Sequence, residues 1–373
     1  MKPLSCLPVV HLDAATALAR GQQHGEQLRV WIQDMAAIRL QLLRKECDFR
    51  SDQDVFDLAE VHVPLLQAFD TQLFEECMGI AQGSNTTLQQ IVIVNHYTDL
   101  RDLRRRRVCQ GTSAATHKRD PGGCSTIYVP RQQGALLGQT WDIHVSALPY
   151  VALLHVKWQP IADTLPSEAF LITVAGCVGM TGMNHHGVAV CINNLHSVTA
   201  QKGVLWPAVV RKALQYSTAK QAMEVILQCQ VGSGRHYAVA DPHHIQAAEV
   251  HCTAKVLLPT HHQKPYWHTN HCLNEEMAKH HFIPPHSSTR HRLSTLHNLL
   301  SQQPPESLTE MLACLQQVVI VPKQEVHTRV HNSATCAALV MDLQQKQLHA
   351  CAWAPSPQAA LKQISMCDRV GPS

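Results

Sequence analysis

The sequence is poor in aromatic and charged residues, and it contains no long apolar run. Aromatic residues make up 5% of the 373 residues and charged residues 16%, with a formal net charge of +3. A charge this small does not indicate a nucleic-acid or anionic-membrane partner. No stretch approaches the roughly 18 consecutive apolar residues that a membrane helix needs. The first 20 residues lack the apolar core and cleavage site of a signal peptide, so we expect a cytoplasmic protein.

Cysteine and histidine are frequent, but neither is arranged in a recognisable binding motif. The 14 cysteines include no CxxC pair and no tight cluster, which is typical of reduced, mostly buried thiols. The 26 histidines include three adjacent pairs, His243–His244, His261–His262 and His280–His281. None of these pairs has HExxH or Cys–His finger spacing. We expect no metal and no cofactor, and a histidine-based metallohydrolase remains a minor alternative.

Hydrophobic periodicity divides the chain near residue 123. Residues 1 to about 105 carry apolar side chains at helical spacing and predict a helical region, in which 91–94 is either strand or helix. Small and polar residues then dominate, and we expect an exposed linker near 104–123. The arginine block Arg104–Arg107 at its start indicates an exposed charge run rather than a nucleic-acid patch.

Short apolar segments after residue 123 predict a β-rich region. A hairpin is predicted from 124–129 and 134–138, joined by the four-residue loop 130–133. Further strands are predicted at 151–156, 170–174, 188–192, 237–240, 247–250, 337–343 and 347–353. Helices are predicted at 206–216, 218–228, 289–301 and 307–318. Many strands with helices packed over them indicate an α+β or layered αββα domain.

The junction between the linker and the first strand carries the clearest chemical signal. Gly122 and Gly123 precede Cys124, and glycine permits the bent backbone in which the Cys124 sulfur attacks the carbonyl of Gly123. Hydrolysis of the resulting thioester gives Cys124 a free α-amine, whose unperturbed pKa of about 7.7–8 suits a general base. Thiol and base on one residue form a minimal activated nucleophile. The alternative is an inert cysteine in a glycine-rich turn.

Several segments, taken in order, carry a family resemblance. They are RGQQHG at 20–25, GIAQGS at 79–84, GCSTIY at 123–128, GALLGQTWD at 134–142, GMNHHGVAVCINNL at 182–195, HTNH at 268–271 and SSTR at 287–290. Their order and spacing resemble the penicillin acyltransferase (isopenicillin-N acyltransferase-like) family of N-terminal-nucleophile cysteine hydrolases. The resemblance implies a four-layer αββα fold and autocatalytic cleavage between Gly123 and Cys124. It also implies a helical prosegment, 1–123, that stays associated with a catalytic fragment, 124–373.

The same resemblance suggests roles for individual residues. Asp142, one hairpin beyond the nucleophile, is expected to hold or orient the new amine, unless it only caps a turn. Asn193 matches the position that donates an amide N–H to the oxyanion, but Asn194 beside it points to the opposite strand face, which leaves a one-residue ambiguity. Asn270 is a candidate second amide donor or a turn residue. Arg290 is a candidate clamp for a substrate carboxylate, a support for the nucleophile or a surface charge.

The implied activity is that of an amidase or acyltransferase. Its substrate would be a small amide or an acyl-CoA-type thioester, and an acyl–Cys124 intermediate would pass the acyl group to water or an amine. The cleaved N-terminal fragment is the expected protein partner, and neither nucleic acid nor a membrane is expected. An alternative of a different class is a catalytically silent binding or scaffold protein with the same fold.

Overall fold

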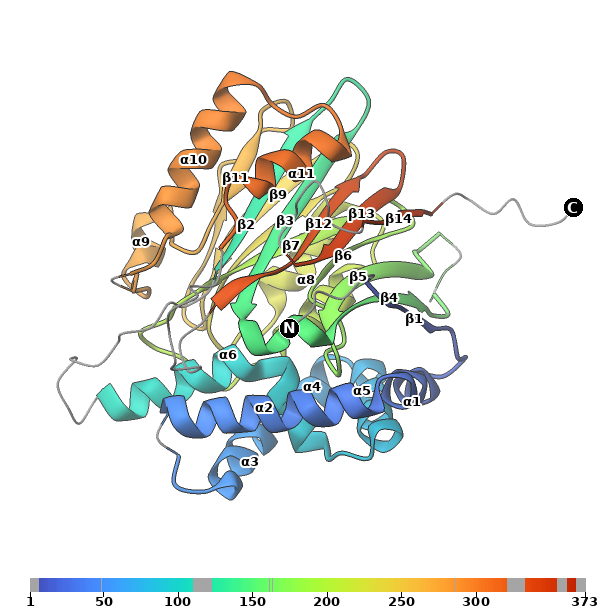
Figure 1. The fold of residues 1–373 in the computed structure, drawn as a ribbon, viewed down its shortest axis with the longest axis vertical. Coiled ribbons are helices and arrows are strands. Elements are labelled where there is room, and N and C mark those ends of the chain that lie inside the picture. The colour runs from blue at the N-terminus through green and yellow to red at the C-terminus, as the bar shows by residue number, and fades with distance from the viewer. Residues whose placement is uncertain are drawn as a thin grey trace, which may run out of the picture.

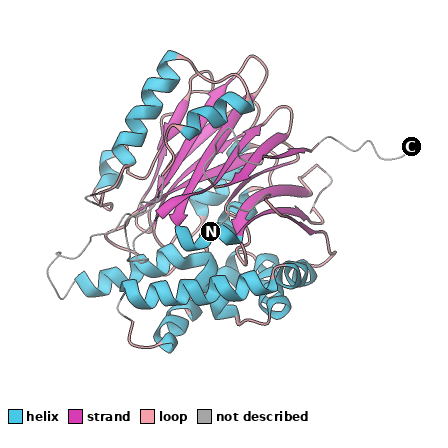
Figure 2. Cartoon of the chain, viewed as in Figure 1, coloured by secondary structure: helices cyan, strands magenta, loops and turns pink. Residues whose placement is uncertain are grey.

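The computed structural model describes residues 7–47, 49–109, 123–160, 162, 164–284, 286–320, 333–353 and 361–366. Two β-sheets are stacked between two layers of helices, and the N-terminal helices pack across one end of this sandwich (Figure 1). Figure 2 shows the same separation by secondary structure, with the strands in the centre and the helices around them. The expected four-layer αββα arrangement is confirmed.

The N-terminal region is helical, as predicted, with one short strand. Its elements are β1 (Val9–Leu12), α1 (Ala17–Gln27), α2 (Arg29–Cys47), α3 (Asp52–Glu60), α4 (Val63–Phe69), α5 (Thr71–Ser84) and α6 (Leu88–Cys109). The ambiguous segment 91–94 lies within α6. Because α6 continues to Cys109, the expected linker does not begin at 104. The rest of that linker, 110–122, lies outside the described residues, and none of the described helices is long and apolar enough to cross a membrane.

Two of the family-like segments hold α1 and α5 together. Their glycines face one another across the helix crossing: Gly21, Gly25, Gly79 and Gly83. A Cβ atom on Gly21 would lie 2.0 Å from the carbonyl oxygen of Glu76, and one on Gly79 would lie 2.1 Å from that of Leu18. No side chain fits at such distances. These segments therefore bring two helix backbones into contact and lie away from the predicted nucleophile.

The two sheets share most of the hydrophobic core. The eight-stranded sheet has the order β1, β4 (Val151–Lys157), β5 (Glu168–Val174), β6 (Thr181–Asn184), β7 (Ala189–Leu195), β8 (Gly234–Ala240), β9 (Ile245–Val250) and β10 (Lys255–Leu258). The six-stranded sheet has the order β11 (Tyr266–His268), β2 (Gly123–Pro130), β3 (Ala135–His144), β12 (Ser333–Asp342), β13 (Gln347–Ala352) and β14 (Lys362–Ser365). The predicted hairpin is β2–β3, and it is confirmed.

Helices cover the outer faces of both sheets. The eight-stranded sheet is covered by α7 (Trp206–Ala213) and α8 (Ala219–Gln228), and the six-stranded sheet by α10 (Thr289–Gln302) and α11 (Leu308–Gln316). The short elements η1 (Val145–Tyr150) and α9 (Glu275–Ala278) complete the described helices. The strands β1, β6, β10, β11 and β14 were not predicted, because they are only three or four residues long.

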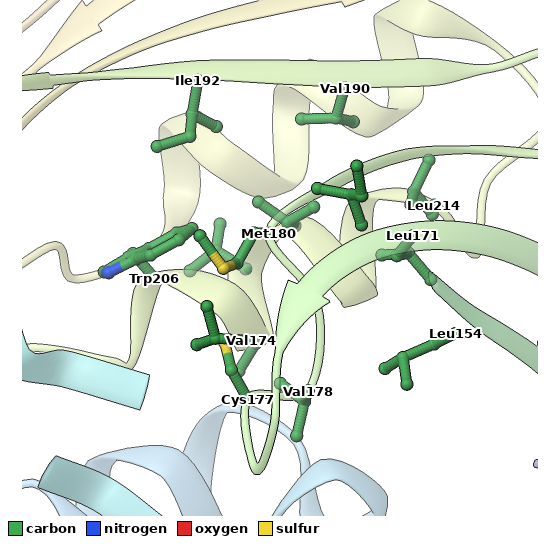
Figure 3. Packing of buried hydrophobic residues seen from close by; sticks show 14 of the residues in the cluster. Leu154, Leu171, Val174, Cys177, Val178, Met180, Val190, Ile192, Trp206 and Leu214 are labelled. Carbon is green, nitrogen blue, oxygen red and sulfur yellow. The ribbon is translucent and has the colours of Figure 1, made fainter. Parts of the chain in front are cut away.

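Part of the outer face of the eight-stranded sheet is apolar. Figure 3 shows Val190 and Ile192 pointing from one strand, β7, towards Trp206 and Met180. All four side chains are buried. Because side chains alternate along a strand, Asn193 of β7 points the other way, between the two sheets. The apolar outer packing thereby fixes which residues of β7 face the six-stranded sheet.

Candidate active site

Cys124 is the second residue of β2, and its side chain is buried between the sheets. Its backbone N–H donates to Oδ1 of Asn270 at 2.7 Å, and its carbonyl oxygen accepts from Arg292 Nη1 at 2.8 Å. Arg292 Nη2 also donates to Asn270 Oδ1 at 2.9 Å. The backbone on both sides of the Cys124 Cα is therefore held by buried polar side chains.

The β11 strand and the start of α10 bring these two side chains to Cys124. β11 pairs with β2, with His268 opposite Thr126, and the chain then continues alongside β2 to Asn270. The backbone N–H of Asn270 donates to Thr289 Oγ1 at 2.7 Å, which fixes this turn against the first residue of α10. Arg292 lies almost one helical turn after Thr289, so both face the site.

Of the three alternatives for Arg290, the structure shows the surface position. Its side chain is exposed on α10, whereas Arg292 is buried and also donates to Ser125 Oγ at 2.9 Å. The helical spacing explains the difference, because Thr289 and Arg292 share a face that Arg290 does not. A helix phase set from Thr289 would have identified Arg292.

Asn270 also contacts Cys124 differently from the expectation. Its side-chain oxygen faces the Cys124 nitrogen, while its Nδ2 donates to the carbonyl oxygen of Asn194 at 3.0 Å. Its amide N–H2 is thus directed at the backbone of β7. Towards Cys124, Asn270 is an acceptor rather than a donor.

Gly123 lies directly against this pair. A Cβ atom on Gly123 would lie 2.3 Å from Arg292 Nη2 and 2.7 Å from Asn270 Oδ1. Any larger residue would displace both groups from Cys124, so the close approach itself requires glycine. The preceding Gly122 lies outside the described residues.

Asp142 lies on β3 opposite Gly123 in the β2–β3 register. Its carboxylate oxygen Oδ1 accepts a hydrogen bond from Thr335 Oγ1 of β12 at 2.6 Å, and its side chain is buried. The hairpin therefore brings the predicted carboxylate beside the Gly123–Cys124 bond, and Thr335 orients it.

The surroundings of the Cys124 thiol favour its protonated form. Burial, and after it the negative charge of Asp142, raise the pKa of Cys124 to about 12. A hydrogen bond with the Asp142 backbone, the charge of Arg292 and a hydrogen bond with the Gln139 side chain oppose this shift. At neutral pH the uncleaved chain therefore holds a thiol rather than a thiolate.

Asn193 faces the six-stranded sheet and is completely buried. Its Oδ1 accepts hydrogen bonds from Thr126 Oγ1 at 3.1 Å and from His236 Nδ1 at 2.7 Å. Its Nδ2 has no hydrogen-bond partner among the described residues. Close by, the Gln139 side chain hydrogen-bonds the backbone of Ile192. Its Oε1 accepts from the Ile192 nitrogen at 2.9 Å, and its Nε2 donates to the Ile192 carbonyl oxygen. A buried amide donor thus remains available beside β2.

Asn194 points to the other face of β7. Its side-chain oxygen accepts a hydrogen bond from Arg235 of β8, whose guanidinium also pairs with Asp99 of α6. Only the backbone carbonyl of Asn194 reaches the site, through Asn270. Of the two neighbouring asparagines, Asn193 has the side chain between the sheets.

The histidine pairs are not assembled into a metal site within the described ranges. No group of three or more histidine, cysteine, aspartate or glutamate side chains in those ranges has a geometry that could hold a metal ion. His244 and His261 are exposed. The ring of His261 stacks on that of His262, and the ring of His244 lies tilted against it.

Comparison with known proteins identifies the family. Residues 129–356, more than half of the chain, match the model of the family described as acyl-coenzyme A:6-aminopenicillanic acid acyl-transferase. The chain belongs to this family. The resemblance inferred from the sequence segments is thereby confirmed. The matched region begins after Cys124, near the end of β2, so membership rests on the later sheets and helices.

A curated relative supports the same assignment. The acyl-coenzyme A:6-aminopenicillanic-acid-acyltransferase 40 kDa form of Emericella nidulans is 28% identical over 202 residues, which are 54% of this chain and 52% of the relative. The chain therefore spans about half the length of the curated relative that it matches.

Solved structures share the fold at low sequence identity. Two variants of the conjugated bile acid hydrolase from Clostridium perfringens superpose with a TM-score of 0.50 each, at 10% and 12% identity. Each comparison covers 65% of this chain and 92% of the hydrolase chain. At this level of identity the likeness shows a common fold only.

Proposed function

We propose that this chain is an autoprocessed cysteine amidohydrolase or acyltransferase in which Cys124 is the nucleophile. The observation that carries the proposal is the close contact of Asn270 and Arg292 with the Gly123–Cys124 peptide bond. Asn270 Oδ1 accepts from the Cys124 nitrogen at 2.7 Å, and Gly123 has no room for a Cβ atom beside Arg292. The same acceptor would hold the α-amine that cleavage creates.

Processing would proceed through a thioester. The Cys124 sulfur bonds to the carbonyl carbon of Gly123, the C–N bond between the two residues breaks, and the thiol proton ends on the released amine. Water then adds to the thioester, leaving a Gly123 carboxylate and a free Cys124 thiol. The products are the fragments 1–123 and 124–373.

Turnover would repeat this chemistry on a substrate. The Cys124 amine takes the thiol proton, and the sulfur attacks the acyl carbon of an amide or thioester. The proton passes to the leaving amine or thiol, and the acyl–Cys124 thioester passes its acyl group to water or to an amine. Asn193 Nδ2 stabilises the oxyanion of each tetrahedral intermediate, and Asp142 stabilises the ammonium form of the new N-terminus.

The substrate class follows from the family relationship. The name of the Emericella nidulans relative specifies an acyl-coenzyme A donor and a 6-aminopenicillanic acid acceptor. We infer that this chain accepts a small amide or an acyl-CoA-type thioester as its acyl donor.

The cleaved prosegment would remain bound. Helix α6 contributes Asp99 to the buried ion pair with Arg235, and α6 lies before the cleavage point. Helices α1–α6 pack across one end of the sheets (Figure 1). Separating the fragments would break this ion pair and expose to water the apolar core that the N-terminal helices share with the sheets, which is unfavourable.

Trapping the acyl–enzyme tests this function. The processed protein is incubated with butyryl-CoA or with butyryl p-nitroanilide, quenched in acid and digested, and the peptide beginning at Cys124 is examined by mass spectrometry. We expect a butyryl adduct on Cys124 and none in Cys124→Ala. Processing without an adduct from any donor in a panel of acyl-CoA thioesters and N-acyl amines would instead indicate a silent binding protein.

A further inference from the structure

A hydrogen-bonded series of polar side chains extends from Asn193 between the two sheets. Asn193 of β7 and His236 of β8 are partners in the strand register, and both are completely buried. His236 Nδ1 lies 2.7 Å from Asn193 Oδ1, and His236 Nε2 lies 2.8 Å from the hydroxyl oxygen of Tyr266 on β11. The six-stranded sheet, which carries Cys124, thus reaches the Asn193 amide through Tyr266 and His236.

The hydrogen-bond partners in this series determine which atoms carry the protons. Burial and the neighbouring His268 lower the pKa of His236 well below its ordinary value, so its ring is neutral and carries one proton. The rings of His236 and His268 stack with centroids 3.6 Å apart. Burial and the charge of Glu249 raise the pKa of Tyr266 well above its ordinary value, so the hydroxyl keeps its proton. A Tyr266 hydroxyl that donates to Nε2 places the His236 proton on Nδ1, from which it is donated to Asn193 Oδ1.

The opposite arrangement would leave two hydroxyl protons, those of the buried Thr126 and the partly buried Tyr266, without acceptors among the described residues. If the Asn193 amide turned over, its Nδ2 would face Thr126 and His236, and both of those groups would have to accept. The His236 proton would move to Nε2, and Tyr266 would have to accept it. Among the described residues, His236 and Asn193 are the only hydrogen-bond acceptors of the Tyr266 and Thr126 hydroxyls, respectively. A hydroxyl that loses its acceptor in this way is unfavourable, which disfavours the reversed amide.

The orientation of this amide decides its chemistry. In the observed orientation Asn193 has its unpartnered Nδ2 free to donate to an oxyanion. In the reversed orientation the carbonyl oxygen would take that place and repel the developing negative charge. Two neighbouring side chains put the amide near the thiol. Thr126, which bonds Asn193, shares a strand face with Cys124, and Gln139 bonds both the Cys124 sulfur and the backbone of Ile192.

We propose that His236 and Tyr266 are positioning residues that hold the Asn193 amide with its N–H2 directed at the acyl oxygen on Cys124. This inference rests on the proposed function. Neither side chain takes part in proton transfer to the substrate. Their contribution is to make one of two amide orientations stable before the reaction begins.

Two substitutions of His236 separate this role from simple packing. In His236→Asn the amide nitrogen takes the place of Nδ1 and can still donate to Asn193 Oδ1. In His236→Gln the amide nitrogen takes the place of Nε2, and that donor is lost. We expect kcat for butyryl-CoA to fall by about 10- to 100-fold in His236→Gln, with KM within twofold. His236→Asn should recover kcat to within about threefold of the wild type.

Tyr266→Phe is the second arm, because it retains the ring and removes only the hydroxyl proton. The amide can then turn over, so kcat should fall by about tenfold with KM unchanged. Melting temperatures of all variants are measured together with the kinetics, which identifies any variant that loses activity by unfolding.

The outcomes keep the inference apart from the proposed function. Equal kcat values for folded His236→Asn and His236→Gln, or an unchanged kcat in Tyr266→Phe, would overturn the positioning role while a wild-type adduct still supports the function. Absence of the Cys124 adduct in the wild type would overturn both.

Discussion

Strands β7 and β8 have two faces that differ sharply in chemistry. On the inner face Asn193 and His236 form uncharged hydrogen bonds next to β2, the strand of Cys124. On the outer face, one residue away on each strand, Asn194 and Arg235 bond to each other, and Arg235 pairs with Asp99 of the N-terminal region. The inner pair leaves an amide donor unused, whereas the outer cluster neutralises a buried charge.

Strand alternation makes this division possible. A two-residue step keeps a side chain on its face, and a one-residue step moves it to the other. The same two strands can therefore hold an amide donor between the sheets and bind the N-terminal helices on the other side. Loss of the outer contacts should reduce stability, and loss of the inner ones should reduce reaction rate.

The largest effect is expected from Asp99→Ala, which removes the ion pair with Arg235 on the outer face. It leaves the Arg235 guanidinium buried without its carboxylate partner, and we expect the free energy of unfolding to fall by about 3–5 kcal/mol. Urea denaturation followed by circular dichroism measures this loss. Asp57→Ala, at an exposed position of α3, is the matched control and should change stability by less than about 0.5 kcal/mol. Equal stability of the two variants would refute the anchoring role.

Asn193→Ala removes the amide donor on the inner face. Removing an oxyanion donor is expected to lower kcat by about 10²–10³-fold, equivalent to about 2.7–4 kcal/mol, because the transition state loses its hydrogen bond. Steady-state kinetics with butyryl-CoA measures the change. Asn194→Ala is the neighbouring control, and its kcat should stay within about threefold of the wild type while its stability falls. If the two variants lost kcat equally, the assignment of the faces would be wrong.

Gly21→Val tests the prosegment at a distance from both faces. The added Cβ would lie 2.0 Å from the Glu76 carbonyl oxygen, so α1 and α5 must separate, at a cost of about 1–3 kcal/mol. Thermal unfolding should report a lower midpoint, whereas Glu26→Val, at an exposed position of the same helix, should have a smaller effect. An unchanged midpoint in Gly21→Val would mean that α1 and α5 do not cross as closely as described.

The pH dependence of processing tests the thiol on the inner face. Because burial raises the pKa of Cys124 to about 12, the thiolate fraction grows about tenfold for each pH unit below that value. The processing rate of freshly synthesised chain should therefore keep rising through pH 9, an effect of about 1.4 kcal/mol per pH unit. A pulse–chase experiment in cell-free translation at pH 7 to 9.5 follows the rate by gel. A plateau near pH 8.5 would point to a thiol with an ordinary pKa.

The hairpin and the layered fold were predictable from local sequence patterns, and the same patterns place Cys124 at the start of the hairpin. The Gly123–Cys124 junction and the alternation of β2 and β3 depend on neighbouring residues only. Arg292 was missed because its direction depends on the phase of α10, which Thr289 fixes through Asn270. A motif match at 287–290 ended before this turn of the helix.

Other parts of the fold and of the site depend on contacts between distant segments. Strand β1 pairs in parallel with β4, and no local pattern within four residues indicates that partner. His236 and Tyr266 likewise have no signal of their own in the sequence, because each gains its role from the stacking of one sheet on the other.

The mass of the purified protein tests the central claim most directly. Autocatalysis by Cys124 predicts two masses, those of residues 1–123 and 124–373, from the wild-type chain purified under native conditions. It predicts the single uncut mass from Cys124→Ala. An uncut wild type, or a Cys124→Ala chain cut at the same bond, would contradict the account.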